Sequence, residues 1–282
     1  MHRNLGNWDS AGAALERALL LDPRDANLYF TIGSFQHYLH RYPEAIEAYR
    51  RTLALAPDFL QARIAMGWSY ILWRGEVDTL RAALRELPRD GEAGAGGTTI
   101  HEQRLILMEW DGQPDSVLAL LQATAGTEYA GTGASGRAMR RAGARLALGD
   151  SAAARADLHL ALGLLDSTLR AAPGDWRGHG ERGLVLAALG RRGEALREAR
   201  WLQQSDAYRL DRSTHGWVMV MRALVLAWAG DHDAALAEVE RALVEPSILS
   251  VPLLRLDPSW APLRNDPRFQ SLLARHPLPG GG

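Results

Sequence analysis

The feature that most constrains the fold of this chain is a repeat of 34 residues near its start. Segments 6–23 and 40–57 align without a gap. Four matched positions carry identical or similar residues: Trp8 with Tyr42, Ala11 with Ala45, Leu15 with Tyr49 and Pro23 with Pro57. A period of about 20 to 50 residues is the signature of a repeat architecture. The chain is therefore expected to stack copies of one small structural unit.

A short motif continues the repeat along the chain, namely Gly or a substitute followed by a polar residue. It occurs at Gly6, His40, Gly75, Gly112, Gly149, Gly190 and Gly230. The gaps between these positions are 34, 35, 37, 37, 41 and 40 residues. We interpret each as the turn between two paired helices. The longer gaps leave open the packing register of the units around Gly112 and Gly149.

Apolar residues between the turns recur at steps of three and four, which places them on one face of a helix. Examples are Leu158, Leu162 and Leu165, and later Leu236, Val239 and Leu243. No stretch alternates with period two. The pattern predicts roughly fourteen helices and no sheet.

The unit 26–57 resembles the tetratricopeptide repeat, a pair of antiparallel helices about 34 residues long. The matching residues are Tyr29, Ile32 and Gly33 on the first helix, Ala45 and Tyr49 on the second, and Pro57 at the end. The resemblance implies an all-α fold, a right-handed superhelical α-solenoid of antiparallel helix pairs. About seven units are expected, the first of them incomplete.

The residue types fit this reading. Gly33 and Ala45 are small where paired helices approach closely, and Pro57 cannot extend the helix that it follows. Asp25 and Asp58 stand where helix N-caps are expected.

Breaks in composition predict the domain organisation. Residues 1–90 form N-terminal units and residues 98–273 form degenerate units with a closing helix. The Gly-rich stretches 91–97 and 127–136 are predicted flexible joints, and residues 274–282 are a tail.

The two ends of the chain suggest an alternative function. Only five residues precede Gly6, too few for the helix that should pair with 8–21, so the first repeat is expected to be incomplete. The chain is then expected to be a fragment, a mis-called start or the tail of a longer protein. The face with Trp8, Leu15 and Leu19 should then be partly exposed or covered by a neighbouring molecule. Residues 254–273 resemble the end of tetratricopeptide regions in bacterial signalling proteins. Such regions often follow a kinase, cyclase or transcriptional-regulator domain. The alternative is therefore a ligand-sensing or regulatory region of a larger signalling enzyme.

Composition narrows the partners and the compartment. There are 32 basic and 33 acidic residues, every basic one Arg, and this balance argues against nucleic acid. There is no Cys, which excludes disulfides and Cys-ligated zinc. The N-terminus lacks the apolar core of a signal peptide, and the run 217–229 is too short to span a bilayer. A cytoplasmic location without membrane insertion is expected.

Catalytic signatures are missing. There is no phosphate-binding GxxxxGK[ST] loop, no GxSxG elbow and no kinase motif set. We expect no enzyme activity, no catalytic residue and no cofactor. His37 and His40 could share a helix face, but no further metal ligand accompanies them. A surface or turn role is the interpretation for both, and no metal site is expected.

Arg137, Arg140, Arg141 and Arg145 form the densest basic cluster. Three of them are four residues apart and line one helical stripe. Two readings stay open, a solvated helix face or a clamp for an acidic peptide or phosphate.

In the family that the chain resembles, the first helix of each pair lines the concave surface. The resemblance places the following residues there: Asn27, Phe30, Ser34, His37, Tyr38, Gln61, Ile64, Trp68, Trp110, Arg140, Arg177, Trp217 and Trp228. Aromatic and Arg side chains dominate peptide-binding hot spots. Phe30, Tyr38, Ile64 and Trp68 are expected to form one apolar patch. The predicted function is a non-catalytic scaffold that binds a peptide or partner helix in this groove. The family's carboxylate clamp needs Lys, which this chain lacks.

Overall fold

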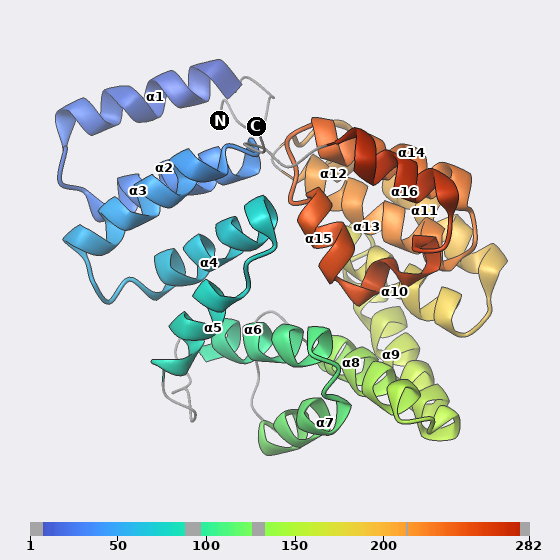
Figure 1. Ribbon diagram of the computed structural model, residues 1–282. Coiled ribbons are helices and arrows are strands. Elements are labelled where there is room, and N and C mark those ends of the chain that lie inside the picture. Colours follow the sequence, from blue (N-terminus) through green and yellow to red (C-terminus); the bar gives the residue numbers. More distant parts are fainter. Residues whose placement is uncertain (1–7, 88–96, 126–132, 213, 277–282) are drawn as a thin grey trace. The chain divides into compact units, whose positions relative to one another are not determined.

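A computed structural model describes residues 8–87, 97–125, 133–212 and 214–276 (Figure 1). Within these ranges every regular element is a helix and there is no strand. The chain divides into two compact units.

The first unit combines residues 1–86 with 206–223 and 236–282. The second unit combines residues 87–205 with 224–235, so the division passes through α13 and α14. The first unit contains α1 (Trp8–Leu21), α2 (Ala26–Tyr38), α3 (Tyr42–Leu55), α4 (Leu60–Arg74), α5 (Asp78–Arg85), α12 (Asp206–Arg209), most of α13 (His215–Trp228) and of α14 (His232–Val244), α15 (Val251–Leu256), the 3-10 helix η2 (Pro258–Leu263) and α16 (Pro267–Arg275). The second contains α6 (Gly97–Trp110), α7 (Pro114–Ala123), α8 (Ala134–Ala147), α9 (Ser151–Ala171), α10 (Trp176–Ala188) and α11 (Arg192–Gln204).

Consecutive helices pack as pairs, most extensively α2 with α3, α8 with α9 and α10 with α11 (Figure 1). The predicted all-α solenoid of helix pairs is confirmed. The described ranges hold sixteen α-helices where about fourteen were expected. The short α12 and α15 are connecting pieces that the repeat pattern did not indicate.

The predicted turns coincide with left-handed backbone. Gly75, Gly112, Gly149, Gly190 and Gly230 all have φ between 64° and 81°. His40 takes the same role with φ 61°, the only positive φ among the described residues other than glycine. Gly6 lies outside the described residues. A left-handed residue ends a helix and satisfies its last carbonyls, which explains why Gly recurs at this point of each repeat.

Close packing also follows the sequence. A Cβ added to Gly33 would lie 2.5 Å from the Tyr49 ring, so only glycine fits there. Ala45 is fully buried beside it. Asp25 caps α2 by accepting hydrogen bonds from the main-chain N–H of Asn27 at 2.8 Å and of Leu28 at 3.2 Å.

The cap predicted at Asp58 is wrong. The N–H of Phe59 donates to Ala56 O at 3.1 Å, in a turn that delays the start of α4 by one residue. The N-cap is therefore Phe59 and not Asp58, and it makes no side-chain capping bond.

The two compact units and the predicted domains divide the chain in different ways. The N-terminal stretch of the first unit ends at Glu86, and the unit also includes two later stretches of the chain. Of the two predicted joints, 91–96 and 127–132 lie outside the described residues. Residues 134–136 begin α8 instead of belonging to a joint, and Ala274 and Arg275 complete α16 instead of starting a tail.

Candidate binding face

The predicted groove residues of α2 contribute largely to packing. Phe30 lies between helices, with its ring centroid 5.8 Å from Tyr49 and 5.1 Å from Phe59. The Ser34 hydroxyl donates a hydrogen bond to the carbonyl of Phe30 at 3.0 Å. Asn27 is exposed.

Tyr38 is buried and does not belong to an open groove. Its phenol oxygen accepts a hydrogen bond from the N–H of Gly216 at 3.0 Å. Its carbonyl accepts one from the N–H of Ser247 at 3.1 Å. Trp8 packs on its ring with centroids 5.6 Å apart. The periodicity of α2 placed Tyr38 on the inner face correctly, but it could not show that distant parts of the chain cover that residue.

The two histidines near the end of α2 are structural. His37 Nδ1 lies 2.7 Å from Ser69 Oγ on α4, which joins neighbouring first helices directly. Burial, and secondly the charge of His40, lower the pKa of His37 to about 4, so its ring is neutral at neutral pH. Within the described ranges no group of three or more potential ligands could hold a metal ion.

The four-residue apolar patch is only partly formed. Ile64 is buried in α4 like Tyr38 in α2, while Phe30 and Trp68 are half-buried. Gln61 is exposed. A ligand reaching this face as it stands would meet two of the four predicted side chains.

The arginines of the α8 stripe pair with groups of the protein itself. Arg137 donates to the carbonyl of Leu121 and Arg140 to the carboxylate of Glu109. Arg141 Nη2 and Arg145 Nη1 each lie 2.6 Å from an oxygen of Asp157, which is buried in α9. All four guanidinium groups are held by the protein itself.

A regular arrangement of such pairs was missed in the sequence. Arg141 pairs with Asp157, Arg182 with Glu198 and Arg222 with Glu238. Each pair is 16 residues apart, and the left-handed glycine of its repeat (Gly149, Gly190 or Gly230) stands midway, eight residues from either partner. The acid of each pair is buried. The signal was available as an Arg and an acid placed symmetrically about a turn glycine.

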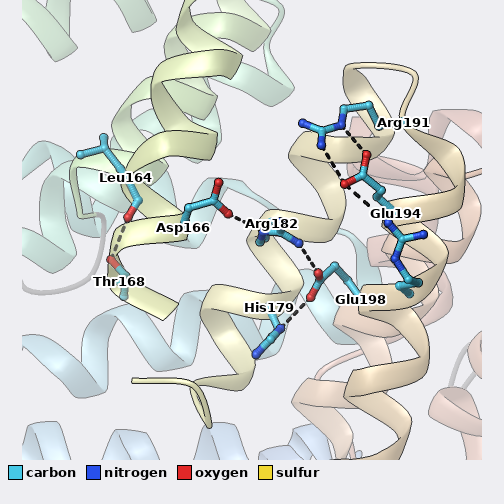
Figure 2. A network of polar contacts seen from close by, with 9 residues as sticks. Leu164, Asp166, Thr168, His179, Arg182, Arg191, Glu194 and Glu198 are labelled. Atoms are coloured by element: carbon cyan, nitrogen blue, oxygen red, sulfur yellow. Dashed lines mark hydrogen bonds and ion pairs between the residues drawn. The ribbon is translucent and has the colours of Figure 1, made fainter. Parts of the chain in front are cut away.

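Figure 2 shows the central pair of this series. Arg182 on α10 donates to Glu198 on α11, and its Nε donates to Asp166 Oδ1 on α9 at 2.7 Å. His179 Nδ1 lies 2.6 Å from the other oxygen of Glu198, and the His179 ring stacks on Trp201 with centroids 3.5 Å apart. Burial disfavours the charge on Arg182, but the hydrogen bond to Asp166 and the charge of Glu198 outweigh it and raise the pKa of the guanidinium. The network joins three successive helices and leaves little of its charge for a ligand.

Three of the remaining predicted groove residues are exposed, namely Trp217, Trp228 and Arg177. Trp217, in the first unit, is 47% exposed, and Trp228, in the second, is 44% exposed. Arg177 is exposed, with its guanidinium 4.4 Å from the ring centroid of Trp176. Among the predicted groove aromatics, Trp217 and Trp228 are exposed, whereas Trp110, like Phe30 and Trp68, is half-buried.

No helix of the described ranges has the length and apolar character needed to cross a membrane.

Comparison with known proteins finds similarity among solved structures. No family model and no curated protein matches the chain. One similar solved structure is a tetratricopeptide repeat protein from Parabacteroides merdae, with TM-score 0.48 and 13% identity, covering 95% of this chain and 92% of that one. Another is YrrB, described as a TPR protein with an unusual peptide-binding site, with TM-score 0.26 and 16% identity, covering 82% and 91% of the two chains. At these TM-scores neither structure is used to assign the fold, which rests on this chain's own helix pairs.

Proposed function

We propose that this protein is a non-catalytic interaction scaffold that binds a peptide or a partner helix on the exposed side of its first helices. The observation that carries the proposal is the exposure of Trp217 and Trp228, both on α13, the first helix of its pair. Most other large apolar residues of α13 are buried, and Val218, Met219 and Val225 are fully so. An indole that stays nearly half exposed offers a large apolar surface to a ligand. It is also the side chain most enriched in binding hot spots.

The charge arrangement supports a peptide ligand over an anionic one. The arginines of α8 and the pairs centred on the turn glycines are engaged inside the protein. An acidic ligand that used these arginines would have to compete with these bonds. Apolar and aromatic contact therefore provides the binding energy in this proposal.

The proposal is tested by selecting a displayed library of random peptides on the immobilised full chain. The selected peptides should bind Trp217→Ala or Trp228→Ala at least tenfold more weakly than the unmodified chain, since loss of an aromatic anchor costs about 2 kcal/mol or more. Both sites are exposed, so the melting temperature should change little.

Two exposed leucines away from the first helices provide matched controls. Leu210, 65% exposed, lies in the first unit, and Leu160, 50% exposed, lies on α9 of the second. Their replacement by Ala should leave peptide affinity unchanged. A selection that yields no specific peptide, or peptides that bind the Trp and Leu variants equally, contradicts the proposal.

A further inference from the structure

Residues 246–256, here called the return segment, pack within the first unit on helices from the beginning of the chain. Ser247 lies 207 positions after His40, yet its Oγ is 3.3 Å from His40 Nε2. The six-residue helix α15, which ends the segment, packs against α4. The receiving surface consists of Tyr38, His40 and Gly75, here called the docking edge.

Main-chain hydrogen bonds fix the start of the return segment. Tyr38 is the last residue of α2, and the final carbonyls of a helix have no partner within it. The N–H of Ser247 supplies that partner by donating to Tyr38 O at 3.1 Å. The Tyr38 hydroxyl in turn accepts from the N–H of Gly216, one of the first residues of α13. A Cβ on Gly216 would lie 2.5 Å from Pro246 O, so the segment passes directly over this point.

Apolar contacts fix the end of the segment. A Cβ placed on Gly75 would lie 3.6 Å from Pro252 Cβ and 3.7 Å from Leu256 Cδ1, which shows that these side chains rest on the turn after α4. Leu249 and Leu254 are buried. The only charged residue of the segment is Arg255, and it is exposed.

These features are those of a bound peptide more than of a repeat. A helix as short as α15 has no stability of its own, since isolated helices below about 12 residues are marginal in water. Its conformation is therefore imposed by the surface. Main-chain hydrogen bonds combined with apolar side chains in fixed positions are also the usual means by which a groove recognises an extended peptide.

We propose that the docking edge is a peptide-binding site and that the return segment is its displaceable internal ligand. The inference rests on the proposed function, to which it adds a second binding surface with its own built-in competitor. The partner is a predominantly apolar peptide that offers one N–H to Tyr38 O and apolar side chains five and nine residues later, as Ser247, Pro252 and Leu256 do.

The probe is a fluorescein-labelled synthetic peptide with the sequence of residues 246–257, titrated into the full chain by fluorescence anisotropy. In the unmodified chain the tethered segment competes at high effective concentration, so the peptide binds weakly. Leu256→Asp removes an apolar contact of the tethered copy, and the variant should bind the unaltered peptide at least tenfold more tightly than the unmodified chain does. Arg255→Ala, at the exposed neighbouring position, should behave like the unmodified chain.

Circular dichroism establishes that Leu256→Asp is folded. A folded variant that binds the peptide no better than the unmodified chain overturns the proposal. A peptide carrying Asp at the position of Leu256 should bind at least tenfold more weakly than the unaltered one, and equal binding also overturns it.

A measurement on the unmodified chain does not depend on the variant folding. Amide hydrogen exchange in the return segment should accelerate when the unlabelled peptide is added in millimolar excess, because displacement exposes Ser247 N–H to water. Unchanged exchange overturns the proposal. This failure would leave the Trp-dependent library peptides unaffected, while failure of the library selection would leave the exchange result unaffected.

Discussion

Replacing Glu198 tests whether the glycine-centred ion pairs hold the helix pairs together. Glu198 accepts hydrogen bonds from Arg182 and His179 and is buried between α10 and α11. The variant Glu198→Leu introduces an apolar side chain of similar size and leaves Arg182 and His179 without this acceptor. Asp166 still accepts from Arg182 Nε at 2.7 Å, so the guanidinium keeps one partner.

Breaking a buried ion pair by removing one partner costs about 3 to 5 kcal/mol. The remaining bond to Asp166 places Glu198→Leu near the lower end, at about 3 kcal/mol. The double variant Arg182→Met with Glu198→Leu removes both charges and should cost about 1 kcal/mol or less, because an apolar pair avoids desolvation. The chain itself shows that an apolar pair is compatible with the fold, since Ile32 and Ala48 occupy the corresponding positions about His40.

The assay is thermal unfolding followed by circular dichroism. A loss of about 3 kcal/mol should lower the melting temperature by about 6 to 12 °C in a chain of this size. The control is Glu194→Ala, which breaks the exposed pair with Arg191, the N-cap residue of α11, 2.6 Å apart, and should produce no measurable change. The reasoning is refuted if the double variant is as unstable as Glu198→Leu, or if Glu194→Ala destabilises the protein equally.

Two further predictions concern close packing and pH. Gly67→Ala should destabilise the protein by about 1 to 3 kcal/mol, because the added Cβ would lie 2.8 Å from Leu80 Cα. Gly143→Ala, whose Cβ would meet nothing within 4 Å, should stabilise it by about 0.4 to 1 kcal/mol. Equal effects of the two variants in urea unfolding would contradict this. The pKa of His37 is about 4 in the folded chain and near 6.5 when unfolded, so the unfolded chain binds the extra proton between these values. The contribution of neutral His37 to stability should be fully present above pH 6.5 and fall by up to about 3 kcal/mol as the pH drops to 4. His37→Gln, which can still form a hydrogen bond with Ser69, should reduce that dependence. An unchanged pH profile of the urea midpoint in this variant would contradict the prediction.

The helix pairs could be predicted from the sequence because their signals are local. A turn glycine needs left-handed backbone at its own position, and Asp25 caps the N–H groups two and three residues later. Gly33 meets Tyr49 only 16 residues away, within one repeat. Such contacts recur with the period of the chain, and the period made them recognisable.

The orientation of a helical stripe could not be predicted in the same way. The spacing of Arg137, Arg141 and Arg145 correctly placed them on one side of α8. Whether that side meets water or a neighbouring helix depends on where the neighbour's acid lies. Asp157 on α9 decided the outcome by accepting from both Arg141 and Arg145.

The sequence by itself therefore determined the fold class, the turn positions and which residues share a helix face. The tertiary structure decided which of those faces remain accessible. Tyr38 was a reasonable groove residue until Gly216 and Ser247, about 180 and 210 positions later, covered it. Contacts at that separation follow no repeat period, because they arise only when the chain folds back on its own beginning.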